Sequence, residues 1–308
     1  MKTFAKRFLL ILGILALPHL PACVENSAPV PNTEYPEETT QGEDDVSRAP
    51  ELRQPDENDV IGKLESFEFA TWNIEQFPKK SDATIEAVVG HIKKWQLDMV
   101  ALQEVVSEKA FNELVERLEG FDGVLVQNQS DLRLGILFKS AEYELKASRE
   151  LPLGDRYAFP RKPFLVELVR IADSEVIQII NVHLKARGGA SNIARRLKAN
   201  EELFAYAEAE LNKNSSQKMI LLGDFNAELE SEEMSFWQAD GSSYDVETLE
   251  LELSDRYTYL GSFKSMIDHI VTVNFTVDET IIPEPFLDLD SYENVISDHL
   301  PVIAIDRP

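Results

Sequence analysis

The stretch "LLGDFNAE" (residues 221–228) ends an apolar run with an acid and an amide, Asp224 and Asn226, on either side of Phe225. One interpretation is a simple turn, because Gly, Asp and Asn are common turn formers. A turn alone does not explain why two oxygen-bearing side chains stand one residue apart at the end of an apolar strand. The other apolar runs of the chain bear on this question.

Polar side chains of the same kind stand at the edges of several other apolar runs. Burying such groups unpaired would cost several kcal/mol per charge, so turn formation does not account for all of them. If the strand ends cluster, they form a ring of oxygen ligands with two imidazoles. Such a set suits Mg²⁺ or Mn²⁺ better than zinc, with Ca²⁺ as a further candidate. The residues are Asn73 in "TWNIE", Glu104 in "ALQEV", His183 in "NVHLKA", Asp268 in "MIDHI", and Asp298 and His299 in "ISDHLPV".

The apolar periodicity predicts short strands that alternate with helices. Helices are expected after Ser81, from about Ser107 to Gly120, and from near Ser191. Residues 229–262 allow no assignment beyond a short helix. Helices placed between pairs of strands imply an α/β two-sheet sandwich with the helices outside. Strands are expected at residues 67–74, 98–105, 123–127, 134–138, 218–225, 266–273 and 301–306, with a hairpin over 164–184 that turns at Asp173 and Ser174.

The first residues are typical of an export signal. Lys2, Lys6 and Arg7 precede an apolar run that is too short to span a bilayer. "LPAC" follows, and its Cys23 is the only cysteine of the chain. A leader that ends in Leu-x-Ala-Cys resembles the lipobox of bacterial lipoproteins, in which the cysteine is lipidated after cleavage. We therefore expect a signal peptide at 1–22 and an exported protein anchored in the membrane of the bacterial cell envelope through Cys23; plain secretion is the alternative.

Residues 23–65 are rich in Pro, Glu, Asp, Asn and Thr, which predicts a disordered acidic tether. Residues 66–308 remain, roughly 240 in number, enough for one large domain with a substantial core. The formal charge of the chain is −25. This charge disfavours tight non-specific binding to DNA, but a site that recruits its own cations is compatible with it.

Seven motifs in a fixed order resemble the endonuclease/exonuclease/phosphatase superfamily. They cover essentially the whole domain, and they include "RKPF" with Arg161 as well as the strand ends described above. The resemblance implies a four-layer α/β/β/α sandwich like that of deoxyribonuclease I, and divalent-metal-dependent hydrolysis of phosphodiester bonds. In chain order the motifs are W-N-I, L-Q-E, R-x-P-F, N-x-H-L, G-D-F-N, I-D and S-D-H-x-P.

The resemblance also implies roles for individual residues. Glu104 would be the principal metal ligand, with Asn73 and Asp298 nearby. Asp224 and Asn226 would position the attacking water and the scissile phosphate. His299 would act as general base or phosphate ligand and be oriented by Asp268. His183 would stabilise the departing oxygen or a phosphate oxygen, and Arg161 would contact the phosphate.

Some of these residues have structural alternatives. His183 could be a core histidine bonded to backbone, and Asp268 could cap a strand. Lys185 and Arg187 could be a solvated edge or could touch substrate. The Arg195, Arg196 and Lys198 cluster reads as the polar face of a helix.

An exported, monomeric nuclease is the leading functional hypothesis, with nucleic acid as the phosphoester partner. The alternatives are a phosphatase or phosphodiesterase for a small phosphoester, an inositol phosphate or a phospholipid headgroup, and a surface binding protein without catalysis. The sequence departs from deoxyribonuclease I in showing no clear carboxylate partner for His183, with Asp131 as a candidate. It also shows no long basic or aromatic insertion that would grip duplex DNA, and no hydrophobic hairpin of the sphingomyelinase type.

Overall fold

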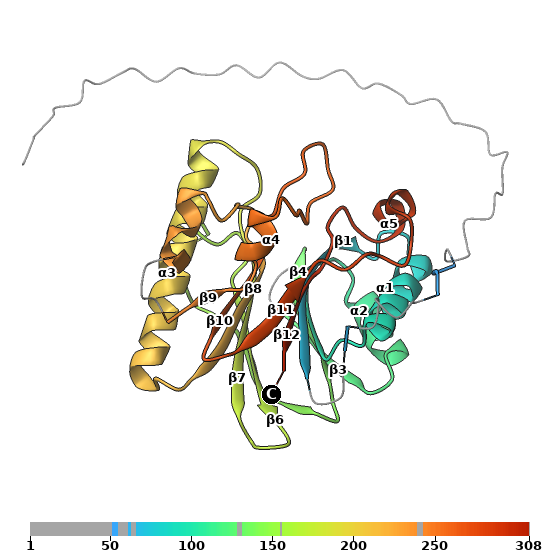
Figure 1. Ribbon diagram of the computed structural model, residues 1–308, viewed down its shortest axis with the longest axis horizontal. Coiled ribbons are helices and arrows are strands. Elements are labelled where there is room, and N and C mark those ends of the chain that lie inside the picture. Colours follow the sequence, from blue (N-terminus) through green and yellow to red (C-terminus); the bar gives the residue numbers. More distant parts are fainter. Residues whose placement is uncertain are drawn as a thin grey trace, which may run out of the picture. The chain divides into compact units, whose positions relative to one another are not determined.

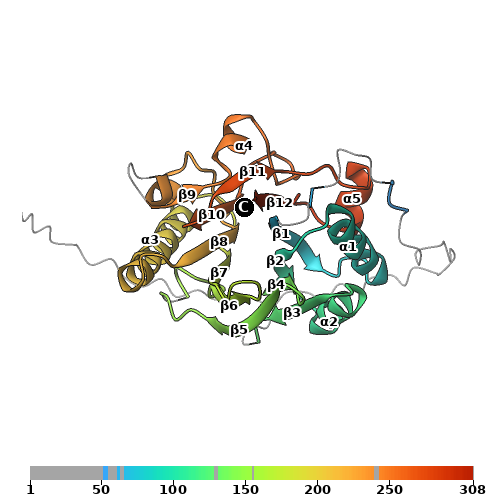
Figure 2. The same ribbon diagram turned by 60° about the horizontal axis from the view of Figure 1, so that its bottom comes forward.

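The computed structural model describes residues 51–54, 61–62, 66–127, 131–154, 156–238 and 243–307. All of them lie in one compact unit, Asp45–Pro308. Two six-stranded sheets face each other, and helices cover the outer face of each sheet (Figures 1 and 2). The predicted four-layer α/β/β/α sandwich is confirmed. The predicted signal peptide, Cys23 and most of the predicted tether lie outside the described residues.

The first sheet has the order β11-β12-β1-β2-β4-β3. β1 runs parallel to β2 and antiparallel to β12, so strands from both ends of the domain pair at the centre of this sheet. Three helices lie on the outer side of this sheet: α1 (Asp82–Trp95), α2 (Glu108–Arg117) and α5 (Leu289–Val295). Its strands are β1 (Phe67–Phe77), β2 (Met99–Val105), β3 (Phe121–Leu125), β4 (Arg133–Lys139), β11 (Val277–Ile281) and β12 (Val302–Asp306).

The second sheet has the order β5-β6-β7-β8-β10-β9. β7 and β8 are parallel, and the long helix α3 (Ala190–Lys213) connects them across the outer face. The 3₁₀ helix η1 (Glu232–Gln238) packs against α3, and α4 (Leu249–Leu253) follows it in the chain. The strands of this sheet are β5 (Tyr143–Glu150), β6 (Phe164–Arg170), β7 (Val176–His183), β8 (Lys218–Asp224), β9 (Asp245–Val246) and β10 (Asp268–Val273).

Strand β8 shows why the strands are apolar on both faces. Successive side chains of a strand point to opposite sides of the sheet. Met219 and Leu221 pack with Leu203 of α3, whereas Ile220 and Leu222 belong to the core that the two sheets share. All four of these side chains are fully buried. An uninterrupted apolar run is therefore required wherever a strand lies between a helix layer and a second sheet.

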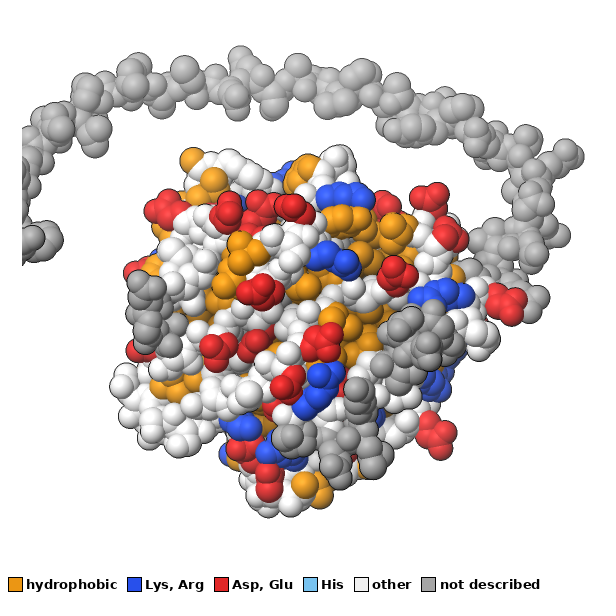
Figure 3. Space-filling view, viewed as in Figure 1, with side chains coloured by type: hydrophobic (Ala, Val, Ile, Leu, Met, Phe, Trp, Pro, Cys, Tyr) orange, Lys and Arg blue, Asp and Glu red, His pale blue; other side chains and the backbone are white. Residues whose placement is uncertain are grey.

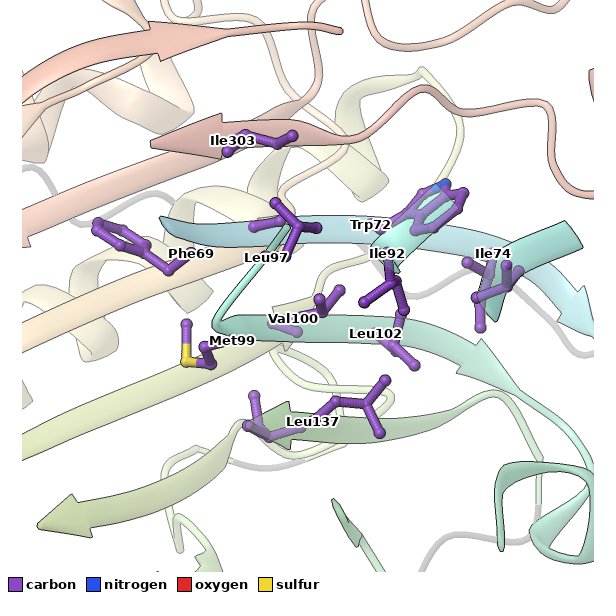
Figure 4. Close-up of a cluster of buried hydrophobic side chains, with 14 of the residues drawn as sticks. Phe69, Trp72, Ile74, Ile92, Leu97, Met99, Val100, Leu102, Leu137 and Ile303 are labelled. Carbon is purple, nitrogen blue, oxygen red and sulfur yellow. The ribbon is translucent and has the colours of Figure 1, made fainter. Parts of the chain in front are cut away.

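The first sheet is packed in the same way. Figure 4 shows buried side chains of β1 and β2 beside Ile92 of α1, Leu137 of β4 and Ile303 of β12. Trp72 is completely buried, and its indole Nε1 donates to the Tyr292 hydroxyl at 2.9 Å. This bond attaches α5 to the centre of β1.

The predicted strands and the three predicted helices are present, but several elements were not predicted. β5 and β11 lie at sheet edges, and most of their side chains are exposed or half-buried, so their sequences lack strong apolar alternation. The region 229–262, for which only a short helix was considered, contains η1, β9 and α4. α5 was also missed.

Packing against the domain begins before residue 66. The Arg53 N–H donates to the Phe286 carbonyl at 2.9 Å, and the Gly62 N–H donates to the Trp95 carbonyl at 3.2 Å. The Leu52 side chain lies so close to Gly90 that an added methyl there would overlap it. Among the described residues, no helix is long and apolar enough to cross a membrane.

Candidate active site

Strand register places three of the predicted residues side by side in the second sheet. β7 and β8 pair His183 with Asp224, and β8 and β10 pair Asp224 with Asp268. The His183 Nε2 lies 3.5 Å from Asp224 Oδ2 and 3.7 Å from Glu104 Oε1, which comes from the first sheet. The site is therefore built across the contact between the two sheets.

The first sheet contributes Asn73 and Glu104. The Asn73 Nδ2 donates to Asp224 Oδ2 at 3.1 Å and lies 3.4 Å from Glu104 Oε1. Asn73 Oδ1 accepts the Glu75 N–H at 3.1 Å, and Glu104 Oε2 accepts the Gln76 N–H at 3.1 Å. Both side chains are thus held by backbone N–H groups as well as by each other.

The backbone is unusual at two site residues. Glu104 has φ = 64°, and the pairing of β2 with both of its neighbours shifts register around it. Asn226 has φ = 53°. Non-glycine residues rarely adopt positive φ, and such conformations and β-bulges concentrate at functional sites, where they re-aim a side chain. The bulge at Glu104 therefore turns its carboxylate toward Asp224 rather than along the regular strand.

Gly223 allows the close approach of β7 and β8 directly before Asp224. Its φ is 145°, and a Cβ at this position would lie 2.0 Å from the Val182 carbonyl oxygen. Any side chain at residue 223 would therefore push the two strands apart. The glycine of "GDFN" is needed to keep His183 next to Asp224.

Asp268 and His299 form the second part of the site. The His299 Nδ1 lies 2.8 Å from Asp268 Oδ2, and its Nε2 lies 3.8 Å from Asp298 Oδ1. Two bonds fix the loop that carries His299: Ser297 Oγ donates to the Asn73 carbonyl at 2.6 Å, and the Tyr292 hydroxyl donates to the His299 carbonyl at 2.7 Å. The expected pairing of Asp268 with His299 is present in the structure.

The two site histidines have opposite proton affinities. Burial disfavours a charge on His299, but Asp268, Asp224 and Asp298 outweigh it and raise the pKa of His299 to about 10. Burial, together with the nearby Arg161, lowers the pKa of His183 well below its usual range. At neutral pH His299 is therefore an imidazolium and His183 is neutral.

Burial also affects two of the acids. Burial and the charge of Asp268 raise the pKa of Asp224 to about 7. Burial raises the pKa of Asp298 to about 6, although the neighbouring His299 opposes this rise. The Asp224 carboxylate is oriented by hydrogen bonds from Asn73 and from the Asn226 N–H, the latter at 2.8 Å. An oriented carboxylate that titrates near neutral pH is suited to exchange a proton with a bound water.

The donor set fits a divalent cation. One ligand atom each of Asp224, Asp268 and His299 lies within 4.8 Å of the others, and all three residues are buried. Asp268 Oδ1 is buried and has no hydrogen-bond partner among the described residues. The Asn73 Nδ2 lies between the Asp224 and Glu104 carboxylates and contacts both. Carboxylate and amide oxygens at this density match the ligands of Mg²⁺, Mn²⁺ or Ca²⁺, and a cation would offset the cost of burying them.

These residues open into a cavity of about 900 Å³. Its walls carry six carboxylates, those of Glu75, Glu104, Asp224, Glu228, Glu233 and Asp298. Acidic side chains are also spread over the face of the domain that Figure 3 shows. Among the described residues that line the cavity, Arg187 is the one exposed cation, since Arg196 is buried in an ion pair with Glu233.

Arg161, predicted to contact the phosphate, is held by two backbone carbonyls. Its Nε donates to the His183 carbonyl at 3.2 Å, and its Nη2 donates to the Leu184 carbonyl at 3.1 Å. Burial lowers the pKa of Arg161, although Asp224 and Glu104 oppose this effect. Arg161 thus adds positive charge beneath the site, and it supports the end of β7.

Arg196 has a role that the sequence did not reveal. It was read as part of a polar helix face, but it is buried, and its guanidinium binds Glu233 Oε1 through Nε at 3.1 Å and through Nη2 at 2.8 Å. Its Nη1 donates to the carbonyls of Lys185 and Arg187 at 2.8 and 2.9 Å. Arg196 therefore anchors the loop that presents Arg187 to the cavity.

The sequence showed no clear carboxylate partner for His183, and the described residues contain none that bonds its Nδ1. The His183 Nδ1 is buried and has no hydrogen-bond partner in the described part of the chain. Asp131, the candidate from the sequence, is exposed, and its charge acts on Arg161. The departure from the deoxyribonuclease I pattern therefore extends to the structure.

Comparisons with known proteins agree with this fold. The catalytic domain of human Nocturnin with bound sulfate is 19% identical, with a TM-score of 0.61 over 78% of this chain and 94% of that one. D. rerio TDP2 in complex with a single-stranded DNA product is 13% identical, with a TM-score of 0.62 over 79% and 99%. A mannosyl-6-phosphatase from Bacteroides thetaiotaomicron is 14% identical, with a TM-score of 0.59 over 77% and 98%.

The family follows from the sequence match. No curated protein sequence matches the chain significantly. The family model described as "Endonuclease/Exonuclease/phosphatase family", however, matches residues 70–299, a range that contains every predicted catalytic and metal-binding residue. The chain therefore belongs to the endonuclease/exonuclease/phosphatase family and is a divalent-metal-dependent phosphoesterase.

Proposed function

We propose that this protein is a nuclease that hydrolyses phosphodiester bonds of nucleic acid and acts as a monomer. One observation carries the proposal. The carboxylate of Asp224 contacts Asn73 and His183 and lies beside the Asp268–His299 pair, and Asp224, His183 and His299 line one cavity. Phosphoester hydrolysis needs an oriented water, neutralised phosphoryl oxygens and a stabilised leaving oxygen, and the groups present can meet each need.

Glu104, Asn73 and Asp298 would hold the divalent cation, with Mg²⁺ or Mn²⁺ preferred and Ca²⁺ as a third candidate. When bound, the cation would neutralise charge that develops on the phosphoryl group. Glu104 is the principal ligand in this proposal because the bulge in β2 aims its carboxylate at Asp224. The cluster of Asp224, Asp268 and His299 is a second place where a cation could be held, provided that the cation displaces the proton of the His299 imidazolium.

Asp224 would accept the proton of the attacking water. Its two oxygens are oriented by separate donors, Asn73 and the Asn226 N–H, so the carboxylate cannot rotate freely. The Asn226 Nδ2 lies 3.4 Å from the Leu184 carbonyl, which keeps the amide near Asp224. From that position, Asn226 would orient the water or the scissile phosphate.

The two histidines would serve different ends of the reaction. His299 is held as an imidazolium by Asp268, which favours the phosphate-ligand role over the general-base role. His183 is neutral and would donate a hydrogen bond to the departing oxygen or to a phosphate oxygen. Arg161, fixed under the end of β7, would contact the phosphate.

A small phosphoester is the second candidate substrate, and the shape of the site is the observation that favours it. The cavity of about 900 Å³ has the size of pockets that bind small molecules. Its acidic walls offer few contacts to the flanking phosphates of a polymer. The similar fold of a bacterial mannosyl-6-phosphatase is consistent with this candidate.

A substrate panel separates these candidates. It comprises plasmid DNA, single-stranded DNA, RNA, sphingomyelin, bis-p-nitrophenyl phosphate and a phosphomonoester, each with Mg²⁺, Mn²⁺ or Ca²⁺ and with EDTA as the control. Cleavage of DNA or RNA supports the nuclease proposal. Hydrolysis of the monoester without cleavage of either polymer would replace that proposal with the phosphatase alternative.

We further propose that the protein is exported and anchored by a lipid on Cys23 in the bacterial cell envelope. The basic start, the apolar run and "LPAC" support this proposal. Cys23→Ser should move the protein from a detergent-requiring membrane fraction to a soluble fraction, because durable anchoring needs more than one acyl chain. Unchanged fractionation in the native host would contradict the proposal.

A further inference from the structure

An aromatic loop (residues 257–265, "YTYLGSFKS") forms one wall of the catalytic cavity. The Tyr259 ring lies against the His299 imidazole, with 5.2 Å between their centroids, and Phe263 lies 5.8 Å from Tyr259. Tyr259 and Phe263 both line the cavity together with Asp224 and His299. A row of rings therefore leads from the reacting centre to the rim.

The loop is fixed to the catalytic segments by its backbone. The Leu260 N–H donates to the Asp298 carbonyl at 2.8 Å, and the Leu300 N–H donates to the Thr258 carbonyl at 2.8 Å. The buried Thr258 hydroxyl accepts the N–H groups of Ile267 and Asp268 at 3.3 Å. The position of the loop is thus set by the same residues that carry the chemistry.

Gly261 allows the Tyr259 ring to fold over the loop. A Cβ at residue 261 would lie 2.3 Å from two atoms of the Tyr259 side chain, its Cζ and its hydroxyl. Phe263, at the other end of the row, is 70% exposed, an unusual state for a large apolar side chain beside a cavity. One face of the row is therefore open to a ligand.

The charges of the cavity restrict that ligand. Glu228 lies near the loop, where its carboxylate accepts a hydrogen bond from Ser265 at 2.9 Å, and Glu75 and Asp298 line the same space. These acids repel a ligand with many phosphates and repel an anionic lipid surface. The ligand must therefore fit the exposed rings and must add little negative charge. A neutral planar group attached to the reacting phosphate does both, because it can stack on the rings and carries no charge.

We propose that Tyr259 and Phe263 bind a nucleobase of the substrate by stacking, which makes the cavity specific for phosphoesters of nucleosides. This inference rests on the proposed phosphoesterase chemistry of the same site and adds the class of group that flanks the phosphate. Stacking of one base on an aromatic side chain contributes about 5- to 150-fold in affinity. Arg187, which lines the same cavity, would contact a second phosphate of the same substrate.

The test compares two ligands that carry the same phosphate and differ by the base: adenosine 5′-monophosphate and ribose 5-phosphate. Their binding is measured by calorimetry in Mg²⁺, which requires no turnover. The wild-type protein should bind the nucleotide about 10-fold more tightly or better. Phe263→Ala should remove most of this preference, whereas Phe263→Trp should keep it. Leu253→Ala is the matched control, because Leu253 is 66% exposed and lies outside the cavity.

A second arm uses single-stranded oligodeoxyadenylate and an abasic backbone of the same length. Cleavage of the abasic strand at the rate of the normal strand, or equal binding of the two small ligands, would overturn the stacking proposal. The protein could instead bind neutral phosphatidylcholine vesicles through Phe263 and show no preference for the base. If Phe263→Ala abolished that binding, Phe263 would be a lipid contact, and the stacking proposal would be overturned. A base preference without cleavage of any nucleic acid would contradict the nuclease proposal and leave the stacking site intact.

Discussion

His91 and His299 are both deeply buried imidazoles, yet their surroundings hold them in opposite charge states. His91 lies in α1 among the rings of Trp72, Trp95 and Phe286, where its Nδ1 bonds the Ala87 carbonyl at 2.7 Å and its Nε2 accepts the Phe286 N–H at 3.0 Å. Burial lowers the pKa of His91 to about 4. The carboxylates around His299 raise its pKa to about 10.

The difference shows that partners, rather than burial, decide what a buried histidine does. Backbone partners use both nitrogens of His91, fix one tautomer and leave no capacity for chemistry. Asp268 occupies only the Nδ1 of His299, and the Nε2 points toward the Asp298 side of the cavity. The aromatic cluster around His91 thus has a structural role. The carboxylates of the acidic cavity, by contrast, carry negative charge that a ligand or a cation would neutralise.

The largest expected effect comes from exchanging each histidine for glutamine. His299→Gln should lower kcat/KM for bis-p-nitrophenyl phosphate by about 10³-fold, within the range that groups stabilising transition-state charge contribute. His91→Gln should leave kcat/KM of the folded protein unchanged and lower the free energy of unfolding by about 1–3 kcal/mol, because a buried backbone group loses its partner. Steady-state kinetics and urea unfolding measure the two quantities. Similar kinetic losses in both variants would contradict the comparison.

The next effect concerns the charge in the cavity. Glu104→Gln keeps the size of the side chain but removes the charge that a divalent cation requires, and we expect activity to fall at least ~10²-fold. EDTA should abolish the activity of the wild-type protein. Glu142→Gln, at a separate cavity that includes Asp98 and Lys139, is the control and should retain full activity. Near-normal turnover of Glu104→Gln at saturating Mg²⁺ would rule out Glu104 as the principal ligand.

His91 and His299 should also give opposite dependences of stability on pH in the metal-free protein. The pKa of Asp224 is raised to about 7 and that of His299 to about 10, so the stability they contribute is present at low pH and is lost as pH rises through these values. The pKa of His91 is lowered to about 4, so its contribution is present above about 6.5 and is lost as pH falls through 4.

Thermal unfolding of the metal-free protein across pH 4–10 checks this prediction. The midpoint should fall on both sides of a maximum, and Mg²⁺ should restore stability on the alkaline side only. His91→Gln should reduce the loss of stability on the acid side, and His299→Gln should flatten the alkaline side. A midpoint that rises steadily from neutral to alkaline pH without metal would contradict the assignment of the cavity acids.

The smallest effect belongs to the exposed loop. Lys185→Ala combined with Arg187→Ala should weaken DNA cleavage several-fold and leave hydrolysis of bis-p-nitrophenyl phosphate nearly unchanged, since the small diester does not reach the loop. For wild-type protein we expect a log–log salt slope of magnitude about 2 to 3 on duplex DNA, because few phosphates are contacted. Arg196→Lys should raise the KM for DNA and leave kcat unchanged, because it loosens the carbonyl anchors of the same loop. Equal losses on both substrates would mean that the loop does not hold a polymer.

The sequence predicted the parts of the site that interrupt apolar strands. Asp224, Glu104 and His183 stood out because a polar residue at the edge of a buried run needs a partner. The ring that these residues were expected to form is present, and strand register explains it. The fold was predictable for the same reason, since strands buried on both faces require two more layers around them.

Other features left no local signal. Arg196 occupies an ordinary charged position of a helix, and its burial depends on Glu233, which lies 37 residues away in a region that the sequence did not resolve. The aromatic loop was missed because its rings become a wall only when the backbone of Leu260 pairs with Asp298. Edge strands β5 and β11 were missed because exposure to solvent removes the apolar alternation by which strands are detected.

The position of β12 between β11 and β1 determines when, during protein synthesis, the enzyme can become active. β1 is made early, but its antiparallel partner along Phe67–Thr71 is made only after almost all of the domain. A chain released before residue 298 contains Glu104, His183 and Asp224 but has an open sheet edge at β1 and no imidazolium in the cavity. We therefore expect such chains to be inactive. Only chains in which β12 has been made and paired with β1 should hydrolyse substrate.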